Sequence, residues 1–223
     1  MQNPNSMKKI RTLILSIVII VVISISAYYY LYTDSTIQTI DVFLSPEIEK
    51  RLEETKPNLL VYKSMRRVFL VENGKLVLGT DNTYVSWPIS LGNSPIGTKE
   101  KEGDQKTPEG LYRFSDHHPS SEYHGSLLIQ YPNSEDASRG EKAKIISSAT
   151  AQNIQQAVKK GSIPDQHTAM GGWVLLHGTS KTFPKDSDTR YAYTYGCVGL
   201  SNAGIYELRE RLPSLSGTVL IIP

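Results

Sequence analysis

The sequence predicts a mainly β domain with a few peripheral helices, preceded by one N-terminal transmembrane helix. Short runs rich in Val, Ile, Leu and Tyr recur from residue 59 onward, and Gly, Pro and Asn separate them, as in a β-rich fold. Ahead of these runs, residues 13–31 contain no charged side chain and consist mostly of Ile, Val and Leu. A helix of that length spans the hydrocarbon core of a bilayer.

Three cations, Lys8, Lys9 and Arg11, precede the apolar run. The positive-inside bias therefore predicts a cytoplasmic N-terminus at residues 1–12, a transmembrane anchor at 13–32 and a periplasmic, extracytoplasmic remainder. A cleaved signal peptide is the alternative, because small side chains near the end of the run would suit a peptidase. The run is longer than a usual signal-peptide core, which favours a single-pass protein of the cytoplasmic (inner) membrane.

The charge beyond the anchor is nearly balanced. Three of the 24 basic residues precede the anchor, so 21 remain against 22 acidic residues. No basic stripe indicates nucleic-acid binding, and the slight excess of positive charge in the whole chain reflects membrane topology. The remaining length of roughly 190 residues is enough for one domain with a sizeable core.

The pattern of each segment predicts its secondary structure. Residues 33–57 are expected to form a linker and a short helix, with Ser45 as N-cap and Pro46 at the first helical position. The Asn73-Gly74 dipeptide predicts a tight hairpin in a mainly antiparallel arrangement. Strands are expected at 59–62, 68–72, 75–78, 84–91, 110–114, 126–131, 173–176 and 219–222. Further helices are expected at 151–160, closed by Gly161, and at 203–211.

Cys197 is the only cysteine and follows His177 by twenty residues. A lone thiol beside Gly196 is either reactive or a small buried hydrophobe. A cysteine nucleophile needs a base, which His177 at the end of an apolar strand would provide, and donors for an oxyanion, which backbone N–H groups near Gly196 would provide. A nearby histidine is also expected to lower the pKa of the thiol. The alternative is an inert core cysteine and a strand-end histidine.

Several ordered motifs resemble the L,D-transpeptidase catalytic domain family, of the YkuD type. His177-Gly178 and the segment Thr194–Leu200 are similar to its His-Gly and Ser/Thr-x-Gly-Cys motifs. Gly103–Tyr112 is similar to the Gly-Asp-x-x-Thr-Pro-x-Gly stretch of the family, and Tyr131-Pro132-Asn133 to its Tyr-Pro-Asn strand. The resemblance covers residues 58–223 and implies a β-rich, sandwich-like L,D-transpeptidase domain.

The resemblance is to a divergent member of that family. Many members have His immediately before the Gly-Cys pair and Arg two residues after the Cys. Tyr195 and Gly199 occupy those positions here. Both residues that carry the chemistry of the family are nevertheless present.

The resemblance implies a peptidoglycan-modifying enzyme that needs no cofactor or metal. It implies acyl transfer from a tetrapeptide stem through a thioester on Cys197, with His177 as base. Thr194 is expected to bond across the turn and to steady His177. The remaining candidates are Gly196, Thr194 and Gly178 as oxyanion or supporting residues, and Tyr195 and Tyr131 as substrate-binding residues.

Two other functions stay open at this point. The thiol chemistry would equally serve an L,D-carboxypeptidase or an amidase-type hydrolase, and a non-catalytic wall-binding module would keep the fold without the reaction. His117, His118 and His124, with Asp116 and Glu122, match no standard zinc spacing.

Three further groups of polar residues have structural interpretations. Asp104 and Glu109 are expected to hold the Thr107-Pro108 turn. Arg66-Arg67 is interpreted as a solvated strand edge, and His167 has no evident partner in the sequence.

Overall fold

A computed structural model of the chain describes residues 44–80, 82–117, 125–178 and 193–223. The domain that these residues form begins at Pro46. The expected anchor at 13–32 lies outside the described residues. Within the described part of the chain, every helix is too short or too polar to cross a membrane.

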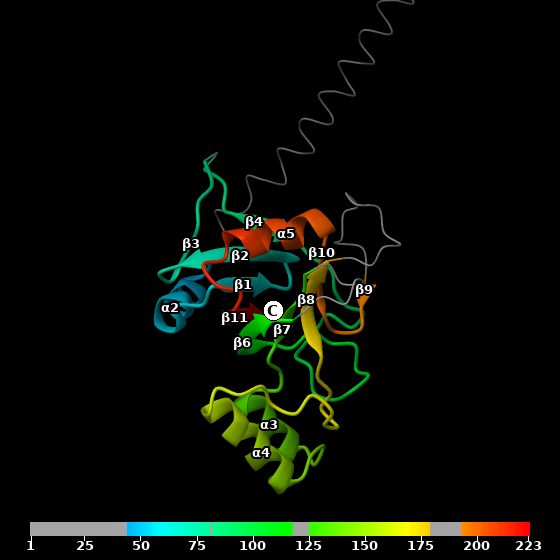
Figure 1. The fold of residues 1–223 in the computed structure, drawn as a ribbon. Coiled ribbons are helices and arrows are strands. Elements are labelled where there is room, and N and C mark those ends of the chain that lie inside the picture. Colours follow the sequence, from blue (N-terminus) through cyan, green and yellow to red (C-terminus); the bar gives the residue numbers. More distant parts are fainter. Residues whose placement is uncertain (1–43, 81, 118–124, 179–192) are drawn as a thin grey trace, which may run out of the picture. The chain divides into compact units, whose positions relative to one another are not determined.

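The domain is built on one sheet of nine strands (Figure 1). Its strand order is β10-β8-β7-β6-β11-β1-β2-β3, and β4 also pairs with β2. These strands are β1 (Leu59–Tyr62), β2 (Arg67–Glu72), β3 (Lys75–Leu76), β4 (Ser86–Pro88), β6 (Gly110–Asp116), β7 (Leu127–Ile129), β8 (Val174–Gly178), β10 (Val198–Leu200) and β11 (Gly217–Ile222). A second, small sheet pairs β5 (Leu91–Gly92) with β9 (Tyr193–Thr194).

The mainly β class is confirmed, with a different arrangement of strands from the one expected. Most pairings are antiparallel, as predicted, but β1–β11, β8–β10 and β5–β9 are parallel, so the sheet is mixed. The nine strands form one sheet and not a sandwich of two large sheets. The expected strand at 84–91 is divided into β4 and β5, because Ser90 between them pairs with Gly199 across a separate bridge.

Alternation along the strands separates the core face of the sheet from the other face. The main cluster of buried side chains contains Val174 and Leu176 of β8 but not their neighbours Leu175 and His177. Successive side chains of a strand point to opposite faces, so Leu175 and His177 share the face away from this cluster. The cluster takes alternate residues in the same way from β1, β2, β6, β7, β10 and β11, and α5 contributes further apolar side chains to it.

The predicted Asn73-Gly74 hairpin is confirmed between β2 and β3. Both residues have positive φ, 51° and 78°, as a two-residue turn of this kind requires. Glycine is needed for a second reason, because a Cβ on Gly74 would lie 2.9 Å from the carbonyl oxygen of Leu52. Leu52 belongs to α2 (Pro46–Thr55), which begins at Pro46 as the sequence predicts. Helix α2 is therefore packed against the hairpin turn.

Helices α4 (Ser148–Lys159) and α5 (Asn202–Arg211) correspond to the two further helices expected. Helix α3 (Ser134–Lys142) was not predicted. Its signal is a capping box, in which the Asn133 side chain accepts from the N–H of Asp136 and the Asp136 carboxylate accepts from the N–H of Asn133. Helices α3 and α4 pack together at one end of the domain, and α5 lies at the other end (Figure 1).

Candidate active site

Strand register places Cys197 and His177 on the same face of the sheet. Strand β10 follows Cys197 directly and runs parallel to β8, with Gly199 opposite His177. The N–H of Leu175 donates to the Cys197 Sγ at 3.4 Å, so the thiol lies beside Leu175. His177 is two residues further along β8 on that face, a rise of about 7 Å. The fold thus places the two residues that the sequence singles out on one face of two neighbouring strands.

The His177 ring is held in one tautomer. Its Nδ1 lies 2.5 Å from the carbonyl oxygen of Gly178. A carbonyl oxygen can only accept, so Nδ1 carries the proton and Nε2 of the neutral ring keeps its lone pair. Burial lowers the pKa of His177, and the bond to Gly178 opposes this effect only in part. The ring is therefore a neutral base near pH 7, and Gly178 supports it through its carbonyl group.

The expectation of a lowered thiol pKa is wrong for Cys197. Burial raises the pKa of the Cys197 thiol, and two weaker influences oppose it, the Leu175 N–H and the positive charge of Lys99. Desolvation of the charged thiolate outweighs both. The thiol also donates to the carbonyl oxygen of Trp173, with a distance of 3.6 Å between Sγ and oxygen. The resting pair is a protonated thiol and a neutral imidazole.

Thr194 holds the turn that carries Cys197. Its Oγ1 accepts from the Gly196 N–H at 3.1 Å and donates to the Cys197 carbonyl oxygen at 2.7 Å. The expected bond across the turn is confirmed, but these two partners are backbone groups of the turn and not His177. Because the Gly196 N–H is used in this way, it is not free to bind an oxyanion. Gly196 has a φ of +133°, and a Cβ there would lie 2.9 Å from the Lys106 carbonyl oxygen.

Gly199 lies too close to Ser90 to carry a side chain. The two residues exchange backbone hydrogen bonds, from the Ser90 N–H at 2.8 Å and from the Gly199 N–H at 3.0 Å. A Cβ on Gly199 would lie 2.4 Å from the Ser90 Oγ. The Ser90 side chain thus occupies the space that the Cβ of an Arg at position 199 would need.

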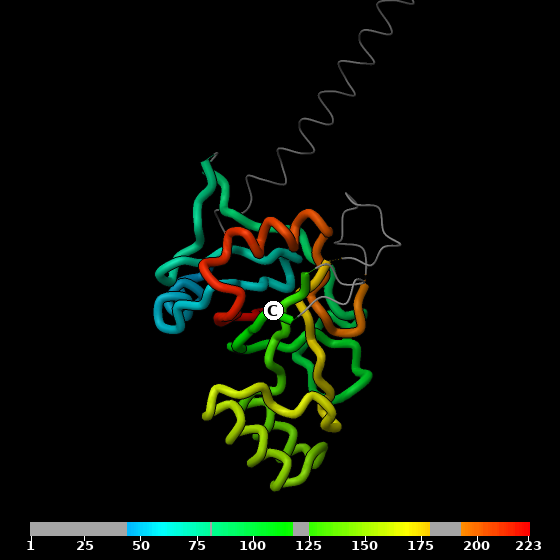
Figure 2. The backbone as a smooth tube through the Cα atoms, in the orientation of Figure 1, coloured from blue at the N-terminus to red at the C-terminus, as the bar shows by residue number. Residues whose placement is uncertain are grey.

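The loop after β5 lies beside the Cys197 turn (Figure 2). The Asn93 N–H donates to the Thr194 carbonyl oxygen, and the Gly92 N–H donates to the Thr107 Oγ1. Within the loop, the Asp104 carboxylate accepts from the Lys99 ammonium group and from the backbone N–H groups of Glu100, Lys101 and Lys106. Asp104 therefore fixes the loop, as the sequence indicates.

The prediction that Tyr131 binds substrate is wrong. Its side chain is 0% exposed, and its hydroxyl group donates to the carbonyl oxygen of Lys99 at 3.4 Å. A ring without exposed surface cannot reach a ligand. The sequence held the relevant signal, because Leu127, Ile129 and Tyr131 alternate toward the core. Tyr195 is 87% exposed, and its contact with substrate stays a prediction.

Trp173 is a residue of the site that the sequence analysis missed. It has a positive φ of 53°, its side chain is 47% exposed, and its carbonyl group accepts from the thiol. The ring centroids of His117 and His167 each lie 5.7 Å from that of Trp173, so His167 does have a partner. The buried Gln166 Oε1 accepts from the Trp173 N–H at 2.9 Å and holds this backbone conformation. The only sequence signal was the Gly171-Gly172 pair ahead of the strand.

The histidine cluster around Asp116 does not form a metal site in the described part of the chain. Among the residues that the structure describes, no group of three His, Cys, Asp or Glu is placed to hold a metal ion. His118, Glu122 and His124 lie outside the described residues. Asp116 pairs with Arg209 at 2.8 Å.

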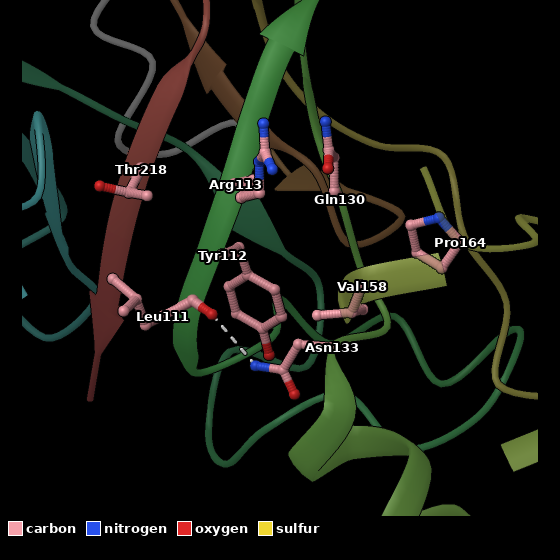
Figure 3. Close-up of a pocket in the computed structure, with 8 residues that line it drawn as sticks. All are labelled: Leu111, Tyr112, Arg113, Gln130, Asn133, Val158, Pro164 and Thr218. Atoms are coloured by element: carbon pink, nitrogen blue, oxygen red, sulfur yellow. Dashed lines mark hydrogen bonds between the residues drawn. The ribbon is translucent and has the colours of Figure 1, made fainter. Parts of the chain in front are cut away.

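A cavity of about 120 Å³ opens beside β6, and neither Cys197 nor His177 lines it (Figure 3). It is lined by Leu111, Tyr112, Arg113, Gln130, Asn133, Val158, Pro164 and Thr218. Asn133 Nδ2 donates to the Leu111 carbonyl oxygen at its rim.

The sequence and the fold of the chain are similar to those of known proteins. The model of the L,D-transpeptidase catalytic domain family matches residues 56–222. No curated protein matches the chain. Among solved structures, the chain is similar to the helical cell shape determining protein Pgp2 from Campylobacter jejuni, with 20% identity, a TM-score of 0.46 and coverage of 78% of this chain and 53% of that one.

A second similar structure is the L,D-transpeptidase from Xylanimonas cellulosilytica. Its identity is 17% and its TM-score 0.37, with coverage of 74% of this chain and 59% of that one. The chain thus spans little more than half the length of each of these two solved structures.

Proposed function

The chain belongs to the L,D-transpeptidase catalytic domain family, and on that premise we propose that it is a cysteine acyltransferase acting on the stem peptides of peptidoglycan. The observation that carries this proposal is the tautomer of His177. The bond from Nδ1 to the Gly178 carbonyl oxygen leaves Nε2 as the basic nitrogen, on the face of the sheet that also carries Cys197. A thiol and an oriented neutral imidazole are the two groups that cysteine acyl transfer requires.

The first half-reaction forms an acyl-enzyme. His177 Nε2 takes the proton of the Cys197 thiol as Sγ attacks the carbonyl carbon ahead of the terminal D-alanine of a tetrapeptide stem. The C–N bond then breaks, and the imidazolium returns the proton to the amine of the departing D-alanine. Because burial raises the pKa of the thiol, proton transfer accompanies the attack instead of preceding it.

The second half-reaction releases the acyl group. An acceptor amine attacks the thioester carbonyl and gives its proton to Nε2. The C–S bond then breaks, and the imidazolium returns the proton to the leaving Sγ, which restores the thiol. The Thr194 hydroxyl fixes the Cys197 carbonyl and occupies the Gly196 N–H, so we assign the Cys197 N–H as the backbone donor to the oxyanion.

Hydrolysis is the second candidate reaction, and one observation favours it. Gly199 packs against the Ser90 hydroxyl, so the cationic side chain that many family members carry at this position is absent. With water as the acceptor, the same acyl-enzyme would give a shortened stem, the product of an L,D-carboxypeptidase. Chromatography of muropeptides after incubation with the enzyme separates the crosslinked product from the shortened one.

The proposed site of action is the extracytoplasmic face of the cytoplasmic membrane. This proposal rests on the cations ahead of the uncharged run at 13–31. A reporter enzyme that works only outside the cytoplasm, fused after Pro223, should be active. Activity of a cytoplasm-only reporter at the same position would contradict the proposed topology.

The acyl-enzyme is tested by intact-mass spectrometry. A carbapenem has a strained lactam that the thiol would open, so the wild-type chain should gain the mass of one drug molecule. The chain has one cysteine, and Cys197→Ala should therefore gain nothing. Tyr195→Phe is a matched control that leaves the thiol in place and should still be acylated. A wild-type chain that stays unmodified, and that converts no tetrapeptide, would favour a wall-binding module without catalysis.

A further inference from the structure

A second cavity, of about 270 Å³, lies between the turn after β1 and the loop after β5. It is lined by Lys63, Ser64, Arg66, Pro95, Ile96, Gly97, Glu109 and Pro223. Ile96 at its rim is 88% exposed. The cavity is large enough for a carboxylate group and the atoms that carry it, and the chemistry of its cations decides what it can hold.

The Lys63 ammonium group in this cavity is fully used within the protein. It donates to the Gly97 carbonyl oxygen at 2.8 Å, to the Thr107 carbonyl oxygen at 3.1 Å and to the Glu109 carboxylate at 2.6 Å. An ammonium group has three donors, so Lys63 has none left for a ligand. Its charge is neutralised by Glu109.

Arg66 is the second cation that lines this cavity, and its guanidinium is not fully used within the protein. Its Nη1 is buried and has no hydrogen-bond partner among the described residues. A buried donor without a partner destabilises the folded protein, and more strongly when the group is charged. Arg66 also has a positive φ of 49°, a strained conformation that is often found where a ligand is held. The interpretation of Arg66 as a solvated strand edge therefore does not fit, whereas Arg67 donates to the Ser86 Oγ on β4.

Both walls of the cavity are connected to the Cys197 turn. The Arg66 guanidinium lies 5.7 Å from the centroid of the Tyr193 ring, and Tyr193 immediately precedes the Thr194 that holds the turn. On the other wall, Gly97 belongs to the loop whose Lys106 carbonyl approaches Gly196. The cavity is therefore linked through both walls to the segment that carries the thiol.

The geometry points to Arg66 as a specificity-determining residue that binds a free carboxylate of the stem peptide. This inference rests on the proposed function. A guanidinium presents paired N–H donors that match the two oxygens of a carboxylate, and the ligand would supply the acceptor that Nη1 lacks. The exposed Ile96 and the Tyr193 ring would contact the apolar part of the same substrate.

The test is a cycle of two ligands and two protein variants. The full-length chain in detergent, with Cys197→Ala to prevent turnover, is titrated by calorimetry with a stem tetrapeptide. It is then titrated with the same peptide after every carboxylate has been converted to a carboxamide. Arg66→Met should weaken binding of the free peptide roughly 10- to 100-fold, the range of a charged hydrogen-bonded contact. It should change binding of the amidated peptide less than about twofold, because that peptide has no carboxylate for Arg66 to bind. The difference between the two losses isolates the contact between Arg66 and the carboxylate.

Two further variants separate charge from geometry and from general effects. Arg66→Lys keeps the charge but loses the fork, so its loss should be intermediate. Arg67→Met is the matched control and should bind both peptides like the parent chain. Equal losses for the two peptides, or equal effects of Arg66→Met and Arg67→Met, would overturn the assignment. If Arg66→Met does not fold, the two peptides are compared on the parent chain alone. Equal affinity of that chain for the free and the amidated peptide also overturns the assignment.

The outcomes distinguish this inference from the function on which it rests. Turnover of tetrapeptide by the chain with an intact Cys197, together with equal affinities, would contradict the role of Arg66 and leave the proposed function standing. If neither peptide is bound or converted, the proposed function fails and the inference falls with it.

Discussion

Substitution of Gly199 by Ala should destabilise the domain through one contact. The added Cβ would lie 2.4 Å from the Ser90 Oγ, whereas ordinary contacts begin at about 3.4 Å, so the overlap is about 1 Å. Ser90 is 2% exposed and bonded to Gly199 through both backbone groups, so neither residue can move away freely. Overpacking of this kind costs about 1–3 kcal/mol.

The lower entropy of the unfolded chain with Ala opposes the steric effect on the free energy of unfolding. Replacing Gly by Ala inside a strand usually stabilises a protein by about 0.5–1 kcal/mol, because the unfolded chain loses freedom. The steric term is the larger, so we expect a net loss of about 0.5–2 kcal/mol. For a domain of this size each kcal/mol lowers Tm by about 2–4 °C.

Removal of the Ser90 hydroxyl should abolish the effect. The Ser90 Cβ would lie 3.8 Å from the new methyl group, which is an ordinary contact. Gly199→Ala should therefore be neutral or slightly stabilising in a Ser90→Ala background. A double-mutant cycle by urea unfolding measures the coupling, which we expect to be about 1–3 kcal/mol.

Additive effects of the two substitutions would refute this reasoning, because they would mean that the Ser90 hydroxyl rotates out of the way at no cost. The same steric argument predicts the outcome for Gly199→Arg, which introduces the residue common in the family. This substitution should be tolerated only together with a smaller residue at position 90.

Three further predictions concern the residues around the site. Thr194→Val keeps the shape of the side chain but removes two hydrogen bonds of the Cys197 turn, so it should cost about 1–2 kcal/mol in urea unfolding and reduce turnover, whereas Thr194→Ser should restore both. Lys63→Met leaves the Glu109 carboxylate without its partner and should cost about 3–5 kcal/mol, against less than about 0.5 kcal/mol for Lys50→Met at an exposed pair; similar losses would contradict the burial argument. Burial lowers the pKa of His177, so the unfolded chain binds the proton first and stability should fall as pH drops below about 6.5 and on through the lower pKa of the folded state; His177→Gln should flatten that slope, and an unchanged slope would contradict it.

Local patterns predicted the parts of the fold that local chemistry determines. The Asn73-Gly74 turn and the positive φ of Gly161 after α4 both follow from single residues with strong backbone preferences. Helix α3 was not predicted because its sequence is polar. It buries only Asp136, Ala137 and Gly140, too few residues to give an amphipathic period.

The sequence identified the two residues of the candidate pair, but not Trp173 beside them and not the electrostatics of the thiol. The order of motifs identified Cys197 and His177, and register then placed them on one face. The raised pKa of the thiol could not be read from sequence, because it depends on how much water the fold removes from Sγ. Tyr131 and Arg66 were misjudged for a related reason, since burial is a property of the whole packing and not of the neighbouring residues.

The position of β11 in the sheet has a consequence for how the domain folds. This strand lies between β6 and β1, and Asn58 bonds to Thr218, 160 residues away. The centre of the sheet therefore cannot be completed until residue 222 has been synthesised, and pairings that distant in sequence are slow to form. If the chain is exported as proposed, the edges of β1 and β6 that face β11 stay unpaired on the far side of the membrane until β11 arrives, and such open edges are prone to aggregation.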